Sequence, residues 1–249
     1  MEPLLKEGER IDNIGFGNLR LIQKPGDFCY GIDAVLLATF ADVSKGGKVI
    51  DLGTGTGIIP LILSHRTEET EIIGVEVQKD SYERGLRNVD LNNLSERITM
   101  IHVDVNEIAE KKLFGKHSFD VVTTNPPYIK GGSGIKNKEE AKTIARHETT
   151  ADLSDFIRAA SFLLKERGDF YMIHRPSRLV DICFLCRQHK LEPKKLRLVS
   201  PNRDSAPNLL LIHCVKYGMP ELKFLNPLYV YQENGTYTSE IMSLYEKNK

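Results

Sequence analysis

Short apolar runs alternate with helical patterns through the middle of the chain. Five runs rich in β-branched residues predict buried strands, at 48–52, 71–77, 99–103, 119–124 and 168–174. Four intervening segments repeat apolar residues every three or four positions and predict helices, at 58–64, 79–93, 105–112 and 153–164. Strands that alternate with helices in this way are typical of βαβ units and of a parallel sheet.

The pattern changes after the fifth strand. Residues 179–189 predict an amphipathic helix, and 191–199 and 209–217 predict two further strands. The turn at 200–208 is too short for a crossover helix, so these two strands must pair antiparallel. Before the first strand we expect a small hairpin around 18–23 and then a helix within 28–40.

Composition and charge restrict the class of protein. A chain of 249 residues with 41% hydrophobic residues fits one globular α/β domain. Lys plus Arg equals Asp plus Glu, at 34 each, so any RNA binding must depend on local charge rather than on a net field. No apolar stretch approaches the roughly 20 residues of a membrane span, and the first ten residues are charged where a secretory signal would be apolar. We therefore expect a cytoplasmic protein that does not contact a membrane.

The four cysteines do not predict a disulfide framework. Cys183 and Cys186 have CxxC spacing, but a second ligand pair is missing and both lie in a predicted helix. We expect buried thiols, with a redox or metal role as the alternative. No other set of side chains has metal-ligand spacing, so we expect no metal.

A glycine-rich turn after the first strand predicts a ligand site. Gly53, Gly55 and Gly57 let backbone approach a ligand without obstruction from a Cβ atom. Glu76 closes the next strand 19 residues after Gly57, a spacing at which a carboxylate meets the ribose hydroxyls of an adenosine ligand. The glycine spacing differs from the dinucleotide and triphosphate motifs. Asp51, just before the turn, would be unfavourable beside a pyrophosphate but suits the α-ammonium group of a methionine moiety.

From about residue 30 to residue 217, the chain resembles the class I S-adenosylmethionine methyltransferases. This resemblance implies a Rossmann-like α/β fold, with a seven-stranded, mostly parallel sheet whose last strand is antiparallel and helices on both faces. It implies S-adenosyl-L-methionine as the cofactor, with Asp104 bonding the adenine amino group and Val105 supplying a backbone amide. A simple helix N-cap is the alternative for Asp104.

The resemblance also organises the chain as a single methyltransferase domain. Residues 1–47 would form a hairpin and helix that cover the cofactor site, 48–217 the core, and 218–249 a C-terminal tail.

The motif Asn125-Pro126-Pro127-Tyr128 follows the fourth strand, at the edge where open α/β sheets bind ligands. The two prolines fix a rigid turn, and the alternative interpretation of the motif is a strand terminator with an aromatic lid.

An exocyclic amino nitrogen shares its lone pair with a ring or carbonyl and is a poor nucleophile. The Asn125 side-chain oxygen and the Pro126 carbonyl can each accept a hydrogen bond from this NH2 group while Tyr128 stacks on the flat target. The motif resembles the Asn-Pro-Pro-Tyr of N6-adenine and glutamine-amide methyltransferases.

The simplest interpretation of residues 30–37 is a turn followed by a helix that Asp33 caps. In the amino-methyltransferase families a similar segment covers the methionine end of the cofactor. That resemblance implies further cofactor contacts from Gly31, Asp33 and Ala34.

The catalytic motif alone does not choose between a base and a protein amide. Only 48 residues precede Val49, which we expect to be too few for the helical domain of the release-factor glutamine methyltransferases. No segment matches the target-recognition domain of DNA adenine methyltransferases either. What remains resembles the compact bacterial family that methylates N6 of adenine 37 in the valine tRNA anticodon loop, and this resemblance extends to 146–148, 174–179 and 196–218.

The leading prediction is therefore an N6-adenine methyltransferase acting on RNA, in the anticodon loop of a tRNA. The alternatives are a protein glutamine-amide or other small amine methyltransferase, and a noncatalytic RNA-binding module. Asn125, Tyr128 and Glu76 argue against the last of these. We make no prediction of oligomeric state.

Two basic clusters agree with an RNA substrate, although each could be a solvated face. One follows the catalytic turn and the other lies near the last hairpin: Lys130, Lys136, Lys138, Lys142 and Arg146; Arg187, Lys190, Lys194, Lys195, Arg197 and Arg203. Lys130, Arg175 and Arg203 are the candidates for substrate contact, with an ion pair as the alternative for Arg175. The polar loop at 131–140 lies between the first of these groups and the next helix.

Overall fold

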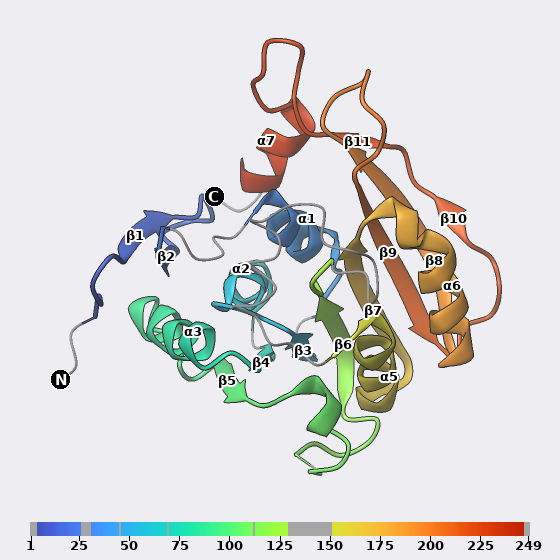
Figure 1. Ribbon diagram of the computed structural model, residues 1–249, viewed down its shortest axis with the longest axis horizontal. Helices are drawn as coiled ribbons and strands as arrows, with labels where there is room; N and C mark the ends of the chain where they lie inside the picture. Colours follow the sequence, from blue (N-terminus) through green and yellow to red (C-terminus); the bar gives the residue numbers. More distant parts are fainter. Residues whose placement is uncertain are drawn as a thin grey trace, which may run out of the picture.

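The computed structural model describes residues 4–25, 31–44, 46–68, 70–111, 113–128 and 151–246. Most of them build one twisted sheet with helices on both faces (Figure 1). A separate two-stranded hairpin lies beside α3, toward the N-terminus. Within these ranges no helix is both long enough and apolar enough to cross a membrane.

The seven predicted strands are present in the predicted directions. Their bounds are β3 (Lys48–Leu52), β4 (Glu71–Glu76), β5 (Ile98–His102), β6 (Phe119–Thr124), β7 (Leu164–His174), β8 (Leu191–Ser200) and β9 (Leu209–Lys216). They lie in the order β8-β9-β7-β6-β3-β4-β5. The strands β3 to β7 are parallel, and β9 runs antiparallel to both β7 and β8. The predicted fold class is therefore confirmed.

The strand count differs from the expected seven. Two short strands, β10 (Lys223–Phe224) and β11 (Leu228–Tyr229), pair parallel with β8, so the sheet in the described part of the chain has nine strands. Two-residue strands leave no alternating pattern in a sequence. The helix α7 (Ser239–Glu246) follows them, and Leu228, Val230 and Ile241 are buried in the same apolar cluster as the first helix.

The helices divide between the two faces of the sheet. Their bounds are α1 (Ile32–Phe40), α2 (Ile58–Arg66), α3 (Lys79–Leu91), α5 (Leu153–Leu163) and α6 (Leu179–Gln188). Residues of α1, α2, α3 and α7 share one core cluster, and those of α5 and α6 share the other. Because successive strand side chains alternate, Val49 enters the first cluster and Ile50 the second.

The prediction of a helix at 105–112 is wrong. Only one 3-10 turn forms there, η1 (Val105–Glu107), followed by turns up to residue 111. Val105 and Ile108 supply the apolar spacing, but they are the buried pair of a single turn, and so short a segment cannot offset the cost of nucleating an α-helix.

The N-terminal hairpin is fixed to α3 by a buried ion cluster. It consists of β1 (Arg10–Asn13) and β2 (Arg20–Gln23). Just before it, the Glu9 side chain is 2% exposed and accepts from Arg87 at 2.5 and 2.7 Å and from Arg84 at 3.2 Å. The Arg87 hydrogen bonds lower the pKa of Glu9 to about 2, so this carboxylate stays charged through the physiological range.

Candidate active site

The predicted site residues converge on one edge of the sheet. Since β3 to β7 are parallel, their carboxyl ends meet there, and the chain order reverses between the neighbours β3 and β6. Such a reversal creates the crevice in which open α/β sheets bind ligands. The glycine turn follows β3, Glu76 ends β4, Asp104 follows β5, and Asn125 follows β6.

The glycine turn has the backbone shape that its sequence requires. Gly53, Gly55 and Gly57 have φ of +70°, +58° and +85°, in the left-handed region that favours glycine. The Gly53 N–H donates to Val75 O at 2.9 Å, and the Gly55 N–H donates to Glu76 Oε2 at 2.8 Å. A Cβ at Gly55 would meet nothing within 4 Å, so a ligand can approach the backbone at this point.

Two buried carboxyls flank the turn. Asp51 is fully buried, and its Oδ1 accepts from Thr123 Oγ1 at 2.7 Å, directly across from it on β6. Its Oδ2 has no hydrogen-bond partner among the described residues. Burial raises the pKa of Asp51 to about 7, against the opposing hydrogen bond from Thr123. Glu76 is 6% exposed, and burial raises its pKa although backbone amides, including those of Gln78 and Gly55, donate to it.

The turn of residues 125–128, which the sequence predicts to be catalytic and which we call the catalytic turn, contacts the start of α1. Asn125 Nδ2 lies 3.2 Å from Asp33 Oδ2, and the Tyr128 hydroxyl lies 3.1 Å from the same oxygen. The hydroxyl also lies 2.8 Å from Asn125 Oδ1. Burial chiefly, and then the Asp33 charge, raise the pKa of Tyr128, so its hydroxyl stays protonated. Of the two prolines between them, Pro126 is buried and Pro127 exposed.

The prediction that Asp33 caps its helix is wrong, and its side chain contacts Asn125 and Tyr128 instead. Gly31 is the N-cap residue, and the Ala34 N–H donates to Asp33 Oδ1 at 3.0 Å. Tyr30, which belongs to the same motif, lies outside the described residues.

His174, the last residue of β7, and Arg175, which follows it, both contact the Tyr128 ring. His174 meets it edge-on, with ring centroids 5.1 Å apart, and the Arg175 guanidinium lies 4.8 Å from its centroid. Burial lowers the pKa of His174 to about 4, and its Nδ1 accepts from the Arg175 N–H, so the imidazole is neutral with its proton on Nε2. Arg175 also donates to Asn208 O at 3.1 Å, which ties the catalytic turn to the loop between β8 and β9.

The remaining predicted residues are less closely gathered. Asp104 Oδ1 accepts from the Asn106 N–H at 2.8 Å, so the N-cap alternative is realised. Val105, next to it, is 7% exposed. The Arg203 guanidinium lies over the Tyr229 ring at 5.6 Å. Lys130, the loop at 131–140 and the other basic residues that follow the catalytic turn lie outside the described residues.

Asn88 is a positioning residue that the sequence analysis missed. It lies on α3 with no exposed surface. Its Nδ2 donates to Thr56 O in the glycine turn at 2.9 Å, and its Oδ1 accepts from the Ile22 N–H in β2 at 2.6 Å. One amide thus joins the turn, a helix and the N-terminal hairpin. The available signal was a polar residue on the apolar face of an amphipathic helix.

Removing this amide is expected to be costly. Asn88→Ala removes the partner of the buried Ile22 N–H and of the partly buried Thr56 carbonyl, which predicts a loss of about 2–4 kcal/mol in the free energy of unfolding. Urea denaturation measures it. The matched change Asn226→Ala, at an exposed position in the tail, should cost less than about 0.5 kcal/mol. A loss at Asn88 as small as that of the control would contradict this role.

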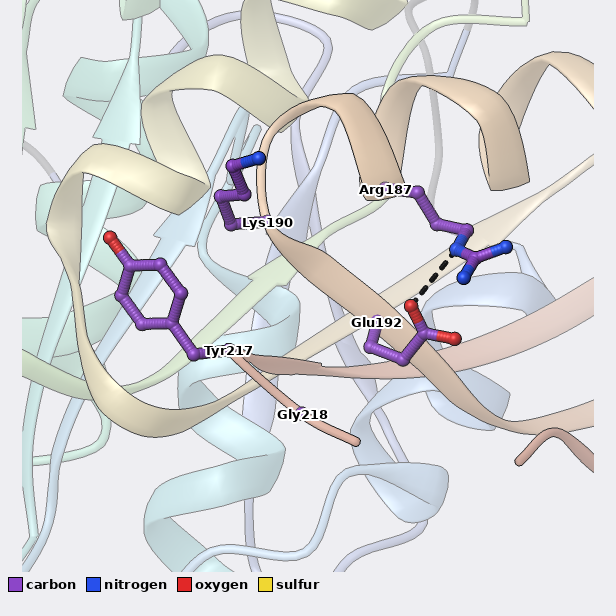
Figure 2. A pocket seen from close by; sticks show the side chains of 5 residues that line it. All are labelled: Arg187, Lys190, Glu192, Tyr217 and Gly218. Carbon is purple, nitrogen blue, oxygen red and sulfur yellow. Dashed lines mark hydrogen bonds and ion pairs between the residues drawn. The ribbon is translucent and has the colours of Figure 1, made fainter. Parts of the chain in front are cut away.

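The hollow drawn in Figure 2 does not belong to this edge. It is lined by Arg187, Lys190, Glu192, Tyr217 and Gly218, which surround the start of β8 and the end of β9. The end of β9 pairs with the first half of β7, so this hollow lies at the amino edge of the parallel strands. Arg187 is engaged there by Glu192 at 3.0 Å.

The cysteines are buried or partly buried free thiols in the described ranges. Cys186 and Cys214 are buried in one core cluster, and Cys183 packs against it. Cys29 is not among the described residues. No group of three or more His, Cys, Asp or Glu side chains with metal-binding geometry occurs within those ranges.

Comparison with protein families and curated proteins gives consistent matches. A family model described as the methyltransferase small domain matches residues 18–180. A protein of Porphyromonas gingivalis named tRNA1(Val) (adenine(37)-N6)-methyltransferase is 29% identical over 222 residues, which cover 87% of this chain and 86% of that protein. A protein of Histophilus somni with the same name is 33% identical over 144 residues, which cover 57% and 59% of the two chains.

Solved structures share the fold at lower identity. A protein of Agrobacterium tumefaciens described as a predicted O-methyltransferase superposes with a TM-score of 0.71 at 23% identity, covering 87% of this chain and 96% of that one. A geranyl diphosphate C-methyltransferase of Streptomyces coelicolor, solved with S-adenosyl-L-homocysteine, gives a TM-score of 0.55 at 14% identity, covering 74% of each chain. At these identities the likeness concerns the fold alone.

Proposed function

Because the family model covers more than half of its 249 residues, the chain belongs to the methyltransferase small domain family, and we propose that it methylates N6 of an adenine in the anticodon loop of a tRNA. It is an S-adenosylmethionine-dependent N-methyltransferase. The names of the curated relatives support this substrate. The observation that carries the proposal is Asn125 at the carboxyl end of β6, beside the glycine turn of β3.

The residues at the edge of the sheet fit the cofactor. The buried Asp51 Oδ2, which no described residue satisfies, suits an α-ammonium group, and Glu76 suits the ribose hydroxyls. The open backbone at Gly55 leaves room for the ligand, with Gly53 and Gly57 shaping the turn. The remaining proposed contacts are Asp104 and Val105 at the adenine, and Gly31, Asp33 and Ala34 at the methionine end.

When bound, S-adenosylmethionine supplies a methyl group on a positively charged sulfur. The Asn125 Oδ1 and the Pro126 carbonyl accept hydrogen bonds from the target NH2, which directs the nitrogen lone pair toward the methyl carbon. Pro127 keeps the turn rigid, and the Tyr128 ring stacks on the flat base. Asn125 and Pro126 would hold the nitrogen while it accepts this methyl group from the sulfur, and the nitrogen would then release one proton to water. The protein contributes mainly orientation, because no strong base is needed before transfer.

Basic side chains at the same edge support a nucleic-acid substrate. Arg175 lies against Tyr128, and Arg203 lies on the loop that Arg175 contacts through Asn208. Together with Lys130, these would hold phosphates around a base turned out of a single-stranded loop.

We propose that the chain acts in the cytoplasm as one domain, with residues 1–47 covering the cofactor, 48–217 forming the core and 218–249 completing it as a tail.

A protein glutamine amide presents the same NH2 geometry and is the competing substrate. The test incubates the protein with tritiated S-adenosylmethionine, tRNA that lacks this modification, and a protein extract. We expect label that ribonuclease releases and protease does not. Label that resists ribonuclease and is released by protease would contradict the RNA substrate and favour the amide.

A further inference from the structure

Three side chains from two distant segments meet at one carboxylate oxygen. Asp33 Oδ2 lies 3.2 Å from Asn125 Nδ2 and 3.1 Å from the Tyr128 hydroxyl oxygen. Asn125 Oδ1 and the same hydroxyl are 2.8 Å apart. The carboxylate comes from the first turn of α1 and the other two groups from the turn after β6.

The chemistry of these groups fixes the orientation of the Asn125 amide. A carboxylate only accepts hydrogen bonds, so the amide atom that faces Asp33 must be the NH2 nitrogen. The Asn125 oxygen then faces the Tyr128 hydroxyl and is the acceptor that a target amino group requires. Without Asp33, rotation of the amide by 180° would present a donor to that target, which would repel its NH2 group.

The Tyr128 hydroxyl has one hydrogen and two acceptors within reach. In the described geometry Asn125 Oδ1 is the nearer acceptor, at 2.8 Å against 3.1 Å for Asp33 Oδ2. A target NH2 that takes Asn125 Oδ1 must displace the hydroxyl hydrogen from it. Leaving this partly buried hydroxyl without an acceptor is unfavourable, and Asp33 Oδ2 avoids that loss because it accepts the hydrogen instead.

The local backbone leaves this carboxylate oxygen available. The Ala34 N–H occupies Asp33 Oδ1 at 3.0 Å, so Oδ2 is the atom that faces the catalytic turn. A Cβ at position 31 would lie 2.7 Å from Asp33 Oδ1, and glycine there avoids this clash. Gly31 and Ala34 therefore fix the orientation of the Asp33 carboxylate, and this carboxylate fixes the orientation of the Asn125 amide.

We propose that Asp33 is a positioning residue for methyl transfer, which orients the Asn125 amide and receives the Tyr128 hydroxyl hydrogen when the target base binds. This proposal rests on the proposed function, since it assigns the Asn125 oxygen to a target NH2 group. It distinguishes Asp33 from a residue that only binds the cofactor.

The kinetic test separates these two roles. With cofactor saturating, Asp33→Ala should lower kcat about 10- to 100-fold because it misaligns the acceptor. Cofactor Kd by calorimetry should rise by a smaller factor than kcat falls, because the proposed contact of Asp33 with the methionine end is one of several cofactor contacts. Asp33→Asn, which keeps an oxygen acceptor for Asn125 Nδ2, should lose less than about tenfold in kcat. In the Asn125→Ala background, adding Asp33→Ala should change kcat less than about threefold, because residues that act as a unit are not additive.

A second measurement needs no substrate. In protein labelled with ¹⁵N-asparagine, the Asn125 side-chain NH2 signal is identified by its loss in Asn125→Ala. That signal should move in Asp33→Ala and return toward its original position in Asp33→Asn. The exposed change Asp181→Ala on α6 is the control and should leave it in place.

The outcomes are distinct. A signal that does not move, independent and multiplicative effects on kcat, or a rise in cofactor Kd with unchanged kcat would each overturn the positioning role. If the wild-type protein labels no RNA while the signal still moves with Asp33, the proposed function fails and the positioning of Asn125 by Asp33 stands.

Discussion

Replacing Asn125 with alanine is expected to lower methyl transfer about 10²- to 10³-fold, because it removes an acceptor that is fixed where the target NH2 must be held. Asn125 directly follows β6, and its Nδ2 lies 3.2 Å from Asp33 Oδ2. Cofactor affinity should change little, since Asn125 is not among the proposed cofactor contacts, which come from the other strand ends and from the start of α1. Single-turnover transfer of tritiated methyl to RNA, together with calorimetry of cofactor binding, measures both quantities.

The control for this change is Asn234→Ala, in the turn that precedes α7, where the side chain bonds only to Thr236 among the described residues. It should transfer methyl at the wild-type rate. If Asn125→Ala retained more than about a tenth of that rate, the acceptor role of the amide would be wrong.

Replacing Asp51 with asparagine is expected to weaken S-adenosylmethionine binding about 10- to 100-fold at pH 7.5, the loss of one charge-assisted hydrogen bond. The pKa of Asp51 is raised to about 7 in the protein without cofactor, chiefly by burial. Its ionised fraction therefore grows as the pH rises from 6 to 7.5, and wild-type affinity should grow with it. The variant should lose this pH dependence, as measured by calorimetry across that range.

The change Asp51→Asn, which should weaken cofactor binding, should stabilise the protein without cofactor. The folded pKa of Asp51 lies above its ordinary value of 3.8, so its contribution to stability is fully present below pH 3.8 and is lost as the pH rises through about 7. The melting temperature gained through Asp51→Asn, without cofactor, should therefore increase between pH 4 and pH 7.

Asp120 provides the matched control on the same sheet. It lies at the amino end of β6, and although burial opposes this, the Lys165 hydrogen bond lowers its pKa. Asp120→Asn should leave cofactor affinity and its pH dependence unchanged. Equal affinity of the Asp51 variant and the wild type at every pH would contradict the ammonium contact.

The part of the site that lies on the strands could be predicted from the sequence. The apolar runs of β3 and β6 are short, are bounded by turn residues and match the structure at both ends. Because parallel strands place their carboxyl ends together, Asp51, Glu76 and Asn125 could be assigned to one edge before any coordinates.

The contacts that join distant segments could not be predicted in this way. Asp33 and Asn125 are 92 positions apart, and Asn88 reaches Ile22 across 66 positions. Periodicity records which face of an element is buried, but not which polar groups meet across the core. The two strands of the C-terminal tail could not be predicted for a related reason. Each of β10 and β11 has two residues and forms only because it pairs with β8.

The central claim is that the methyl group goes to N6 of an adenine in RNA. The most direct measurement digests the labelled tRNA to nucleosides and identifies the radioactive one by chromatography against methylated standards. We predict N6-methyladenosine as the labelled nucleoside. Label on a ring nitrogen, on a ribose hydroxyl or on another base would contradict the account, because the role proposed for Asn125 and Pro126 is to hold an exocyclic amino group.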